Sequence, residues 1–197
     1  MKYCPRCGKE LGTRLEGGRE RAACLDRDCG FIHFGEFSIG AGAVVLRGDK
    51  ALLVQRGWPP NRGAWQLPGG YVEHDEDVAR SVEREVLEEA GIEARVLDLI
   101  GFRHALGGLG GGSSSNVYMV FRLEAESGEP RCDNDEILGA SFYSLDEMAQ
   151  MERVQGLSLW AIRLALALPP AVGLHPDVGS EWLAGRPGNR LFGLRRD

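Results

Sequence analysis

The feature that most constrains this chain is an acidic, amphipathic segment near its centre. Apolar side chains recur at helical spacing through residues 76–90: Val78, Ala79, Val82, Val86 and Ala90. Asp75 precedes the segment as a potential helix cap, and Gly91 follows it as a potential helix stop. We therefore expect a helix over residues 76–90 that packs one face against a core and leaves an acidic face outside.

Three glutamates on this segment stand at positions i, i+3 and i+4, namely Glu85, Glu88 and Glu89. Residues at this spacing share one patch of a helix surface, so their carboxylates repel one another unless a cation neutralises them. Ligands that are all oxygen favour a hard ion, Mg²⁺ or Mn²⁺. From these residues alone, a solvated acidic face without metal is the alternative.

The wider pattern around the helix distinguishes these alternatives. The sequence reads Gly70-x5-Glu76-x7-Arg84-Glu85-Val86-x-Glu88-Glu89-x-Gly91-Ile92. Every specified position of the Nudix box is filled, so the chain resembles the Nudix hydrolase family. Trp65-Gln-Leu-Pro-Gly-Gly70 precedes the box as in many members, and the resemblance covers residues 37–150.

The resemblance implies a catalytic metal site, because Nudix enzymes use divalent metal to hydrolyse a diphosphate that links a nucleoside to another group. The implied Mg²⁺ or Mn²⁺ ligands are Glu85, Glu88, Glu89 and the carbonyl oxygen of Gly70. A bound metal polarises phosphoryl oxygens and lowers the pKa of the attacking water. In the family pattern, Arg84 and Glu76 form a pair that orients the ligand carboxylates.

Other parts of the implied site lie outside the box. Glu136, just before an expected strand, is our candidate general base, with a solvated acidic loop as the alternative. Arg56 and Arg103 are candidates to meet the phosphates, and Trp65 to form a wall of the substrate pocket; each is alternatively an ordinary surface or core residue. The Gly/Ser-rich run 107–115 is either a lid or the tip of a hairpin.

Four of the five cysteines fall within the first 29 residues: Cys4, Cys7, Cys24 and Cys29. Two pairs of thiolates suit a tetrahedral Zn²⁺ site, with free thiols or a redox pair as the alternatives. Because all four positions on the metal would be occupied by protein, we expect a structural role. Cys132 stands far away in sequence and is interpreted as an ordinary thiol.

A zinc ribbon before a Nudix domain resembles the NADH pyrophosphatases. Those enzymes carry a Ser-Gln-Pro-Trp-Pro-Phe-Pro-like array after the box, and residues 93–125 contain nothing of that kind. The order of a cysteine module, a Nudix core and a terminal helix is more similar to ADP-ribose/FAD pyrophosphatase-like members.

The remaining apolar runs place the box in a layered α/β (α+β) domain. Strands are expected at 38–47, 51–56, 96–102, 117–123 and 137–143, and a helix at 157–168. With the resemblance, this predicts a Nudix α/β/α sandwich with a mixed β-sheet. We divide the chain into a zinc ribbon at 1–36, a Nudix domain at 37–168 and a C-terminal extension at 169–197.

We expect metal-dependent hydrolysis of the diphosphate bond in ADP-ribose, FAD or NADH-like compounds. The alternatives are a nucleoside triphosphate pyrophosphohydrolase, or a sensor or nucleic-acid-binding protein built on a Nudix domain. The net charge of −6 argues against non-specific duplex binding, so the expected partner is a small nucleotide rather than nucleic acid. No apolar run is long enough for a membrane span and no signal peptide opens the chain, so we expect a cytoplasmic protein. Family members are often dimers, and a homodimer is compatible with the resemblance.

Overall fold

The computed structural model describes residues 1–107, 114–185 and 187–194. Its strands are β1 Leu11–Glu16, β2 Arg19–Cys24, β3 Phe37–Arg47, β4 Lys50–Arg56, β5 Trp65–Gln66, β6 Gly69–Tyr71, β7 Glu93–Ala105, β8 Ser115–Ser127, β9 Ile137–Tyr143, β10 His175–Pro176 and β11 Phe192–Gly193. Its helices are α1 Val78–Ala90, α2 Leu145–Gln150, α3 Gly156–Ala167 and the 3₁₀ turn Glu181–Leu183. Within the described residues, none of these helices is long and apolar enough to cross a membrane.

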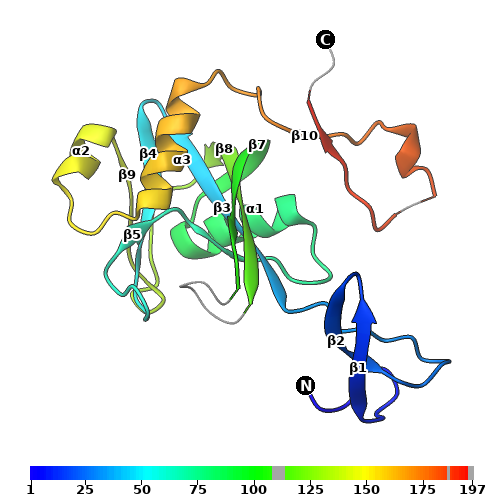
Figure 1. The fold of residues 1–197 in the computed structure, drawn as a ribbon. Helices are drawn as coiled ribbons and strands as arrows, with labels where there is room; N and C mark the ends of the chain where they lie inside the picture. The colour runs from blue at the N-terminus through cyan, green and yellow to red at the C-terminus, as the bar shows by residue number, and fades with distance from the viewer. Residues whose placement is uncertain (108–113, 186, 195–197) are drawn as a thin grey trace.

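The central sheet is mixed, as predicted (Figure 1). Its strand order is β5-β4-β3-β8-β7, with β6 paired to β3 and β9 paired to β4. β3 and β4 form an antiparallel hairpin, whereas β3 runs parallel to β8. The parallel pairing is possible because a long connection containing α1 and β7 separates the two strands in sequence.

Two apolar cores flank the sheet and produce the predicted α/β/α layers. One core joins the sheet to α1 through Val82, Val86 and Phe121. The other joins the opposite face to α3 through Leu53, Val120 and Ile162. Alternate residues of β3 and β8 therefore enter opposite cores, which explains why both strands are apolar on two faces.

The acidic helix begins two residues later than we predicted. Asp77, rather than Asp75, is its N-cap, and the Asp77 side chain accepts a hydrogen bond from the Ala79 N–H. Gly91 ends the helix in the left-handed conformation, as predicted. The sequence analysis missed α2, whose Ser144 and Glu147 form a reciprocal capping box.

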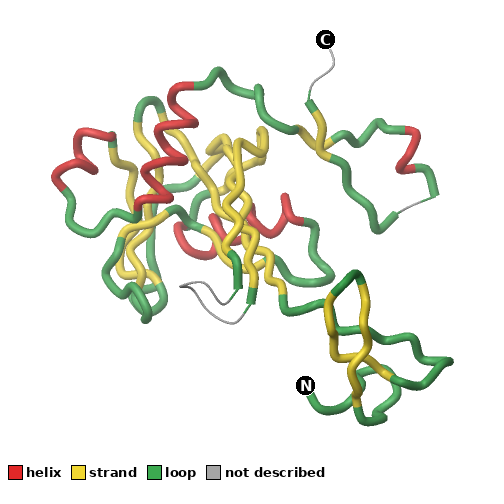
Figure 2. The backbone as a smooth tube through the Cα atoms, in the orientation of Figure 1, coloured by secondary structure: helices red, strands yellow, loops and turns green. Residues whose placement is uncertain are grey.

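The first 36 residues form a two-stranded hairpin with surrounding loops, set apart from the sheet (Figures 1 and 2). Their buried apolar side chains are only those of Cys4, Ala23 and Cys24. A unit with so little apolar burial needs another source of stability.

The chain beyond α3 is mostly loop (Figure 2), but it is attached to the domain at several points. Leu174 exchanges two backbone hydrogen bonds with Leu99 on β7, of 2.8 and 3.1 Å. The ring of Phe192 packs edge-on against Phe121, with 5.9 Å between centroids. Arg190 pairs with Asp77, so the extension also contacts the N-cap of α1.

A buried ion pair lies beneath the same attachment. Arg122 donates two hydrogen bonds to Asp98, of 2.9 and 2.6 Å, and both side chains are almost fully buried. Arg122 also donates to the carbonyl of Leu168 at the end of α3, and Asp98 accepts the Gly173 N–H. This pair therefore ties β7 and β8 to the chain that follows α3.

Candidate active site

The box arginine forms the centre of a charge network on α1. Arg84 donates a two-pronged pair of hydrogen bonds to Glu76, with Nε–Oε1 at 2.9 Å and Nη2–Oε2 at 3.0 Å. Its remaining nitrogen, Nη1, donates to Glu85 at 3.0 Å and to Glu88 at 2.8 Å. The Arg84 guanidinium lowers the pKa of Glu76. Glu76 thus fixes Arg84, and Arg84 in turn orients two of the predicted ligand carboxylates.

The carboxylates of Glu89 and Glu85 meet the backbone of the Gly69-Gly70 turn. Glu89 Oε2 accepts the Gly69 N–H at 2.8 Å. The Glu85 carboxylate lies over Gly70, where a Cβ would come within 2.6 Å of its Oε1. Gly69 has a φ of +146°, and a Cβ there would lie 2.2 Å from the Ala41 carbonyl oxygen. Only glycine fits at Gly69, so β6 can bring this turn against the carboxylates.

Burial makes this part of the site unfavourable for bare negative charge. Burial raises the pKa of Glu89 to about 8, and the neighbouring charges of Glu85 and Glu136 add to the effect. Burial also raises the pKa of Glu85. A divalent cation would relieve both effects, since it replaces the missing solvation and screens the repulsion.

The oxygen donors fit a hard divalent ion, provided that the Glu88 side chain moves. Glu85, Glu89 and the Gly70 backbone converge, and all offer oxygen. The Glu88 carboxylate is instead held by Arg84 and is largely exposed. In the part of the chain that the structure describes, these three carboxylates do not form a group with all ligand atoms within 4.8 Å of one another. Glu88 would have to leave Arg84 to join Glu85 and Glu89.

Glu136 and Arg56 approach the same cluster from other elements. Glu136 precedes β9 and is exposed, and its charge contributes to the raised pKa of both Glu85 and Glu89. The charge of Arg56, at the end of β4, acts on Glu89 in the opposite direction. Arg56 Nε is buried and has no hydrogen-bond partner among the described residues. An anionic ligand would satisfy such a buried guanidinium nitrogen.

A cavity of about 450 Å³ extends from the Gly69-Gly70 turn. Its lining residues are Ser38, Gly40, Arg56, Gln66, Leu67, Gly69, Gly70, Tyr71, Arg103, Ala105, Leu106, Ser114, Asn116, Tyr118, Gln155, Leu157 and Ser158. This volume lies in the range of small-molecule sites. The predicted phosphate-binding residues Arg56 and Arg103 thus line the same cavity as Gly69 and Gly70, whose backbone contacts the carboxylates of Glu89 and Glu85.

Trp65, the predicted wall of the substrate pocket, is not among the residues that line this cavity. Its ring packs edge-on against Tyr143, with 5.2 Å between centroids. Neighbouring residues on a strand point to opposite sides, so Gln66 enters the cavity while Trp65 enters the core beside α3.

The sequence analysis missed Gln66, Gln155 and Ser158 as cavity residues. Gln155 and Ser158 follow α2 by a short loop, and no motif marks them. The aromatic residue Tyr118 also lines the cavity. The expected lid or hairpin tip at 107–115 lies outside the described residues except at its ends.

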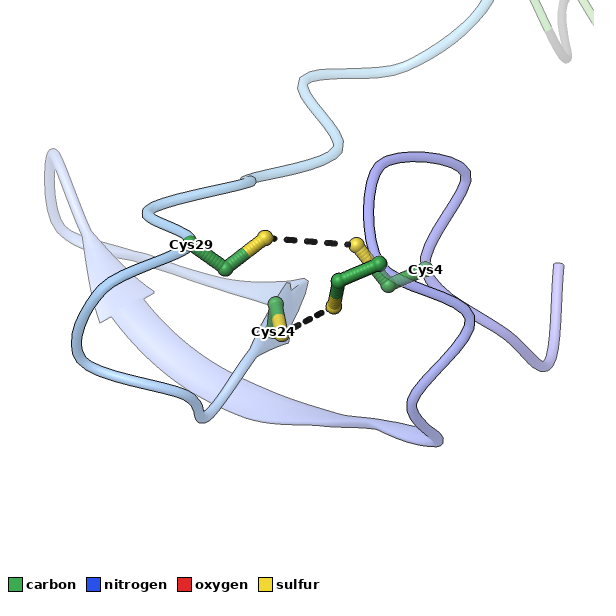
Figure 3. Close-up of side chains that lie close together, drawn as sticks. Cys4, Cys24 and Cys29 are labelled. Atoms are coloured by element: carbon green, nitrogen blue, oxygen red, sulfur yellow. Dashed lines mark hydrogen bonds between the residues drawn. The ribbon is translucent and has the colours of Figure 1, made fainter.

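The four N-terminal cysteines converge in a second cluster (Figure 3). Cys4 and Cys29 bring their sulfurs to 3.6 Å, and Cys7 and Cys24 to 3.5 Å. All four sulfurs lie within 4.8 Å of one another, and none forms a disulfide. Tetrahedral Zn–S bonds of about 2.3 Å would separate the sulfurs by about 3.8 Å, so this cluster fits zinc. Cys132 lies outside it, as predicted.

Comparison with known proteins identifies the family. The sequence model described as "NUDIX domain" matches residues 36–159. A MutT-like protein of Streptomyces ambofaciens is 36% identical over 145 residues, which cover 73% of this chain and 83% of that protein. The NAD-capped RNA hydrolase NudC of Pseudomonas aeruginosa is 30% identical over 173 residues, which cover 84% of this chain and 56% of NudC. The chain therefore spans about half the length of the NudC proteins that it matches.

The fold agrees with this result. The crystal structure of a NUDIX hydrolase from Nitrosomonas europaea superimposes with a TM-score of 0.67 and 26% identity, over 85% of this chain and 91% of that one. A MutT NUDIX hydrolase from Burkholderia pseudomallei gives a TM-score of 0.57 and 30% identity, over 66% of this chain and 98% of that one. The match to the family model covers more than half of the sequence, and it includes α1 and the turn that meets its carboxylates. The chain belongs to the Nudix hydrolase family.

Proposed function

We propose that this protein hydrolyses the diphosphate bond of a nucleoside diphosphate linked to a second group, as in ADP-ribose, FAD or NADH-like compounds, and that it needs Mg²⁺ or Mn²⁺. The observation that carries the proposal is how three features are connected through the Gly69-Gly70 turn. The partly buried carboxylates of Glu85 and Glu89 contact this turn, and the turn lines the same cavity as Arg56, whose Nε has no partner among the described residues.

Each residue has a role that follows from its position. Glu85, Glu89, the Gly70 carbonyl and, after leaving Arg84, Glu88 would hold the metal. The metal supplies Lewis acidity at a phosphoryl oxygen and a more acidic water. Arg84, fixed by Glu76, is a positioning residue that keeps Glu85 in place.

Two arginines and one acid complete the proposed chemistry. Arg56 and Arg103 bind the diphosphate oxygens from the cavity side. Glu136 accepts a proton from the attacking water, because it is an exposed carboxylate whose charge reaches Glu85 and Glu89. The bond between phosphorus and the bridging oxygen then breaks, giving two monophosphates.

We also propose that residues 1–36 form a zinc ribbon with a structural role. The four cysteine ligands leave no open position on the metal for a substrate. The division into ribbon, Nudix domain at 37–168 and extension at 169–197 is part of this proposal.

The test is a hydrolysis panel with Mg²⁺ or Mn²⁺: ADP-ribose, FAD, NADH, NAD-capped RNA and the nucleoside triphosphates. We expect AMP and a second phosphorylated product from at least one dinucleotide-like compound. Glu89→Gln should lower kcat about 10³-fold because it removes a buried ligand charge. Glu126→Gln, on an exposed pair with Arg95, is the matched control and should keep full activity.

The other outcomes are equally informative. Pyrophosphate release from nucleoside triphosphates alone would replace this proposal with the triphosphate alternative. No product from any compound with either metal would contradict catalysis and favour a nucleotide sensor.

A further inference from the structure

The cavity is lined by a pair of amide side chains that the proposed mechanism does not use. Gln66 on β5 is 9% exposed, and Gln155 is partly buried at the start of α3. Gln155 Nε2 donates to Gln66 Oε1 at 2.8 Å. Both side chains line the cavity that begins at the Gly69-Gly70 turn.

The side chain of Gln155 bonds to Gln66 instead of capping its own helix. Gln155 is the N-cap residue of α3, yet it makes no side-chain capping hydrogen bond. Serine, threonine, aspartate or asparagine would cap the helix better. The side chain instead crosses to Gln66, while Ser158, one turn later, accepts the Leu67 N–H at 3.0 Å.

The pair leaves polar groups open to the cavity. Gln66 Nε2 and Gln155 Oε1 have no other hydrogen-bond partner among the described residues, and neither is fully enclosed. If both amides turned over together, one amino group and one carbonyl oxygen would still face the cavity. The wall therefore offers a donor and an acceptor side by side in either orientation.

An aromatic ring lines the same cavity as the amide pair. The ring of Tyr118 lies against the backbone of β3 at Gly40 and Gly42, and the Arg103 guanidinium lies 5.7 Å from its centroid. A Cβ at Gly42 would come within 2.2 Å of Tyr118 Oη, and a Cβ at Gly40 within 2.8 Å of the ring. The two glycines thus make room for the ring.

We propose that Gln66 and Gln155 bind the polar edge of a planar ring in the substrate, an edge that carries a hydrogen-bond donor and an acceptor next to each other. Both the adenine edge and the carboxamide of nicotinamide have this chemistry. The proposal rests on the proposed function, since it assigns the group that the cavity holds while the diphosphate lies at the carboxylates.

The test measures binding of reaction products rather than turnover, by isothermal titration with Mg²⁺ present. The ligands are AMP, nicotinamide mononucleotide and ribose 5-phosphate, which lacks a ring. At least one of the two nucleotides should bind about tenfold more tightly than ribose 5-phosphate. The tighter of the two identifies the source of the ring.

The variants separate ring binding from a structural role. Gln66→Met and Gln155→Met should each weaken the preferred nucleotide about tenfold and leave ribose 5-phosphate unchanged. Gln155 is partly exposed, so its variant provides the test if Gln66→Met does not fold. Gln55→Met is the matched control on β4, because Gln55 donates to the Gly63 carbonyl and does not line the cavity.

Two results would overturn the proposal. One is equal binding of nucleotides and ribose 5-phosphate by the wild type. The other is an equal loss of all three ligands in both glutamine variants. Hydrolysis without ring-dependent binding would contradict this inference alone, whereas absence of hydrolysis in the panel above would contradict the proposed function.

Discussion

The two candidate metal clusters of this protein are built in opposite ways. The cysteine cluster brings four sulfurs within 4.8 Å in a module with almost no apolar core. The carboxylate cluster stands on α1, which is packed against a large core through Val82 and Val86. We expect metal binding by the cysteines to stabilise the fold of the N-terminal module. The apolar core beneath α1, by contrast, holds the carboxylates in place without metal. Metal loss should therefore have different consequences in the two regions.

The largest expected effect is the loss of the N-terminal module. Zinc binding to four thiolates contributes on the order of 10 kcal/mol, and the module has no other comparable source of stability. Cys24→Ser, or removal of zinc with a strong chelator, should unfold residues 1–36 and leave the Nudix domain folded. Hydrogen exchange should show loss of protection confined to that range.

Cys132→Ser is the matched control, since Cys132 lies outside the cluster. Elemental analysis should find one zinc per chain in both Cys132→Ser and the wild type. If the Nudix domain of Cys24→Ser also unfolded, the expectation that zinc stabilises only residues 1–36 would be wrong.

The second effect is a gain in stability of the metal-free protein when Glu89 is replaced. Its pKa is raised to about 8 in the folded protein against 4.5 for the ordinary group. The stabilisation from protonated Glu89 is complete below pH 4.5 and is lost as the pH rises through 8. Glu89→Gln should therefore stabilise the metal-free protein at pH 8.5 by about 2 kcal/mol relative to wild type, even though it should lower kcat.

Thermal unfolding of both proteins at pH 5 and pH 8.5, without and with Mg²⁺, checks this expectation. The difference should be small at pH 5, and Mg²⁺ should reduce it at pH 8.5. Glu88→Gln provides the control, because the Glu88 side chain is largely exposed and should change stability little. A pH-independent difference for Glu89→Gln would show that its charge is not the cause.

The smallest effect concerns the end of α1. Asp77→Ala removes the N-cap and the pairing with Arg190, and it should cost about 1 kcal/mol in urea unfolding. Asp75→Ala should cost less, because Asp75 is exposed and caps nothing. A larger loss of stability in Asp75→Ala than in Asp77→Ala would instead support Asp75 as the N-cap, as the sequence pattern predicts.

Much of the domain could be predicted because its signals are local. The period of Val82, Val86 and Ala90 marked α1, and alternating or continuous apolar runs marked the strands of the sheet. The Asp75 error arose because several acids precede the helix, and only packing decides which of them becomes the cap. α2 was missed because its single buried residue, Met148, gives no periodic pattern.

The candidate site likewise contains residues that local spacing predicts and residues that only tertiary packing brings together. Residues within the box share one helix, so spacing alone placed Glu85 and Glu89 together. The amide pair joins Gln66 to Gln155 across 89 positions, and its formation depends on how α3 docks against β5. Trp65 and Gln66 are neighbours in sequence, and only the direction of the strand decides which of them reaches the cavity.

The attachment of the C-terminal extension has a consequence for the solubility of the domain. β7 is the last strand of the sheet, and Leu174 occupies hydrogen-bonding groups on its outer side. A chain shortened to Leu168 would leave that edge unpaired and Asp98 without the Gly173 N–H. An open strand edge recruits strands from other molecules. The extension, which carries none of the proposed catalytic residues, thus covers the part of this edge at Leu99, and we expect a chain shortened to Leu168 to associate more readily with other copies.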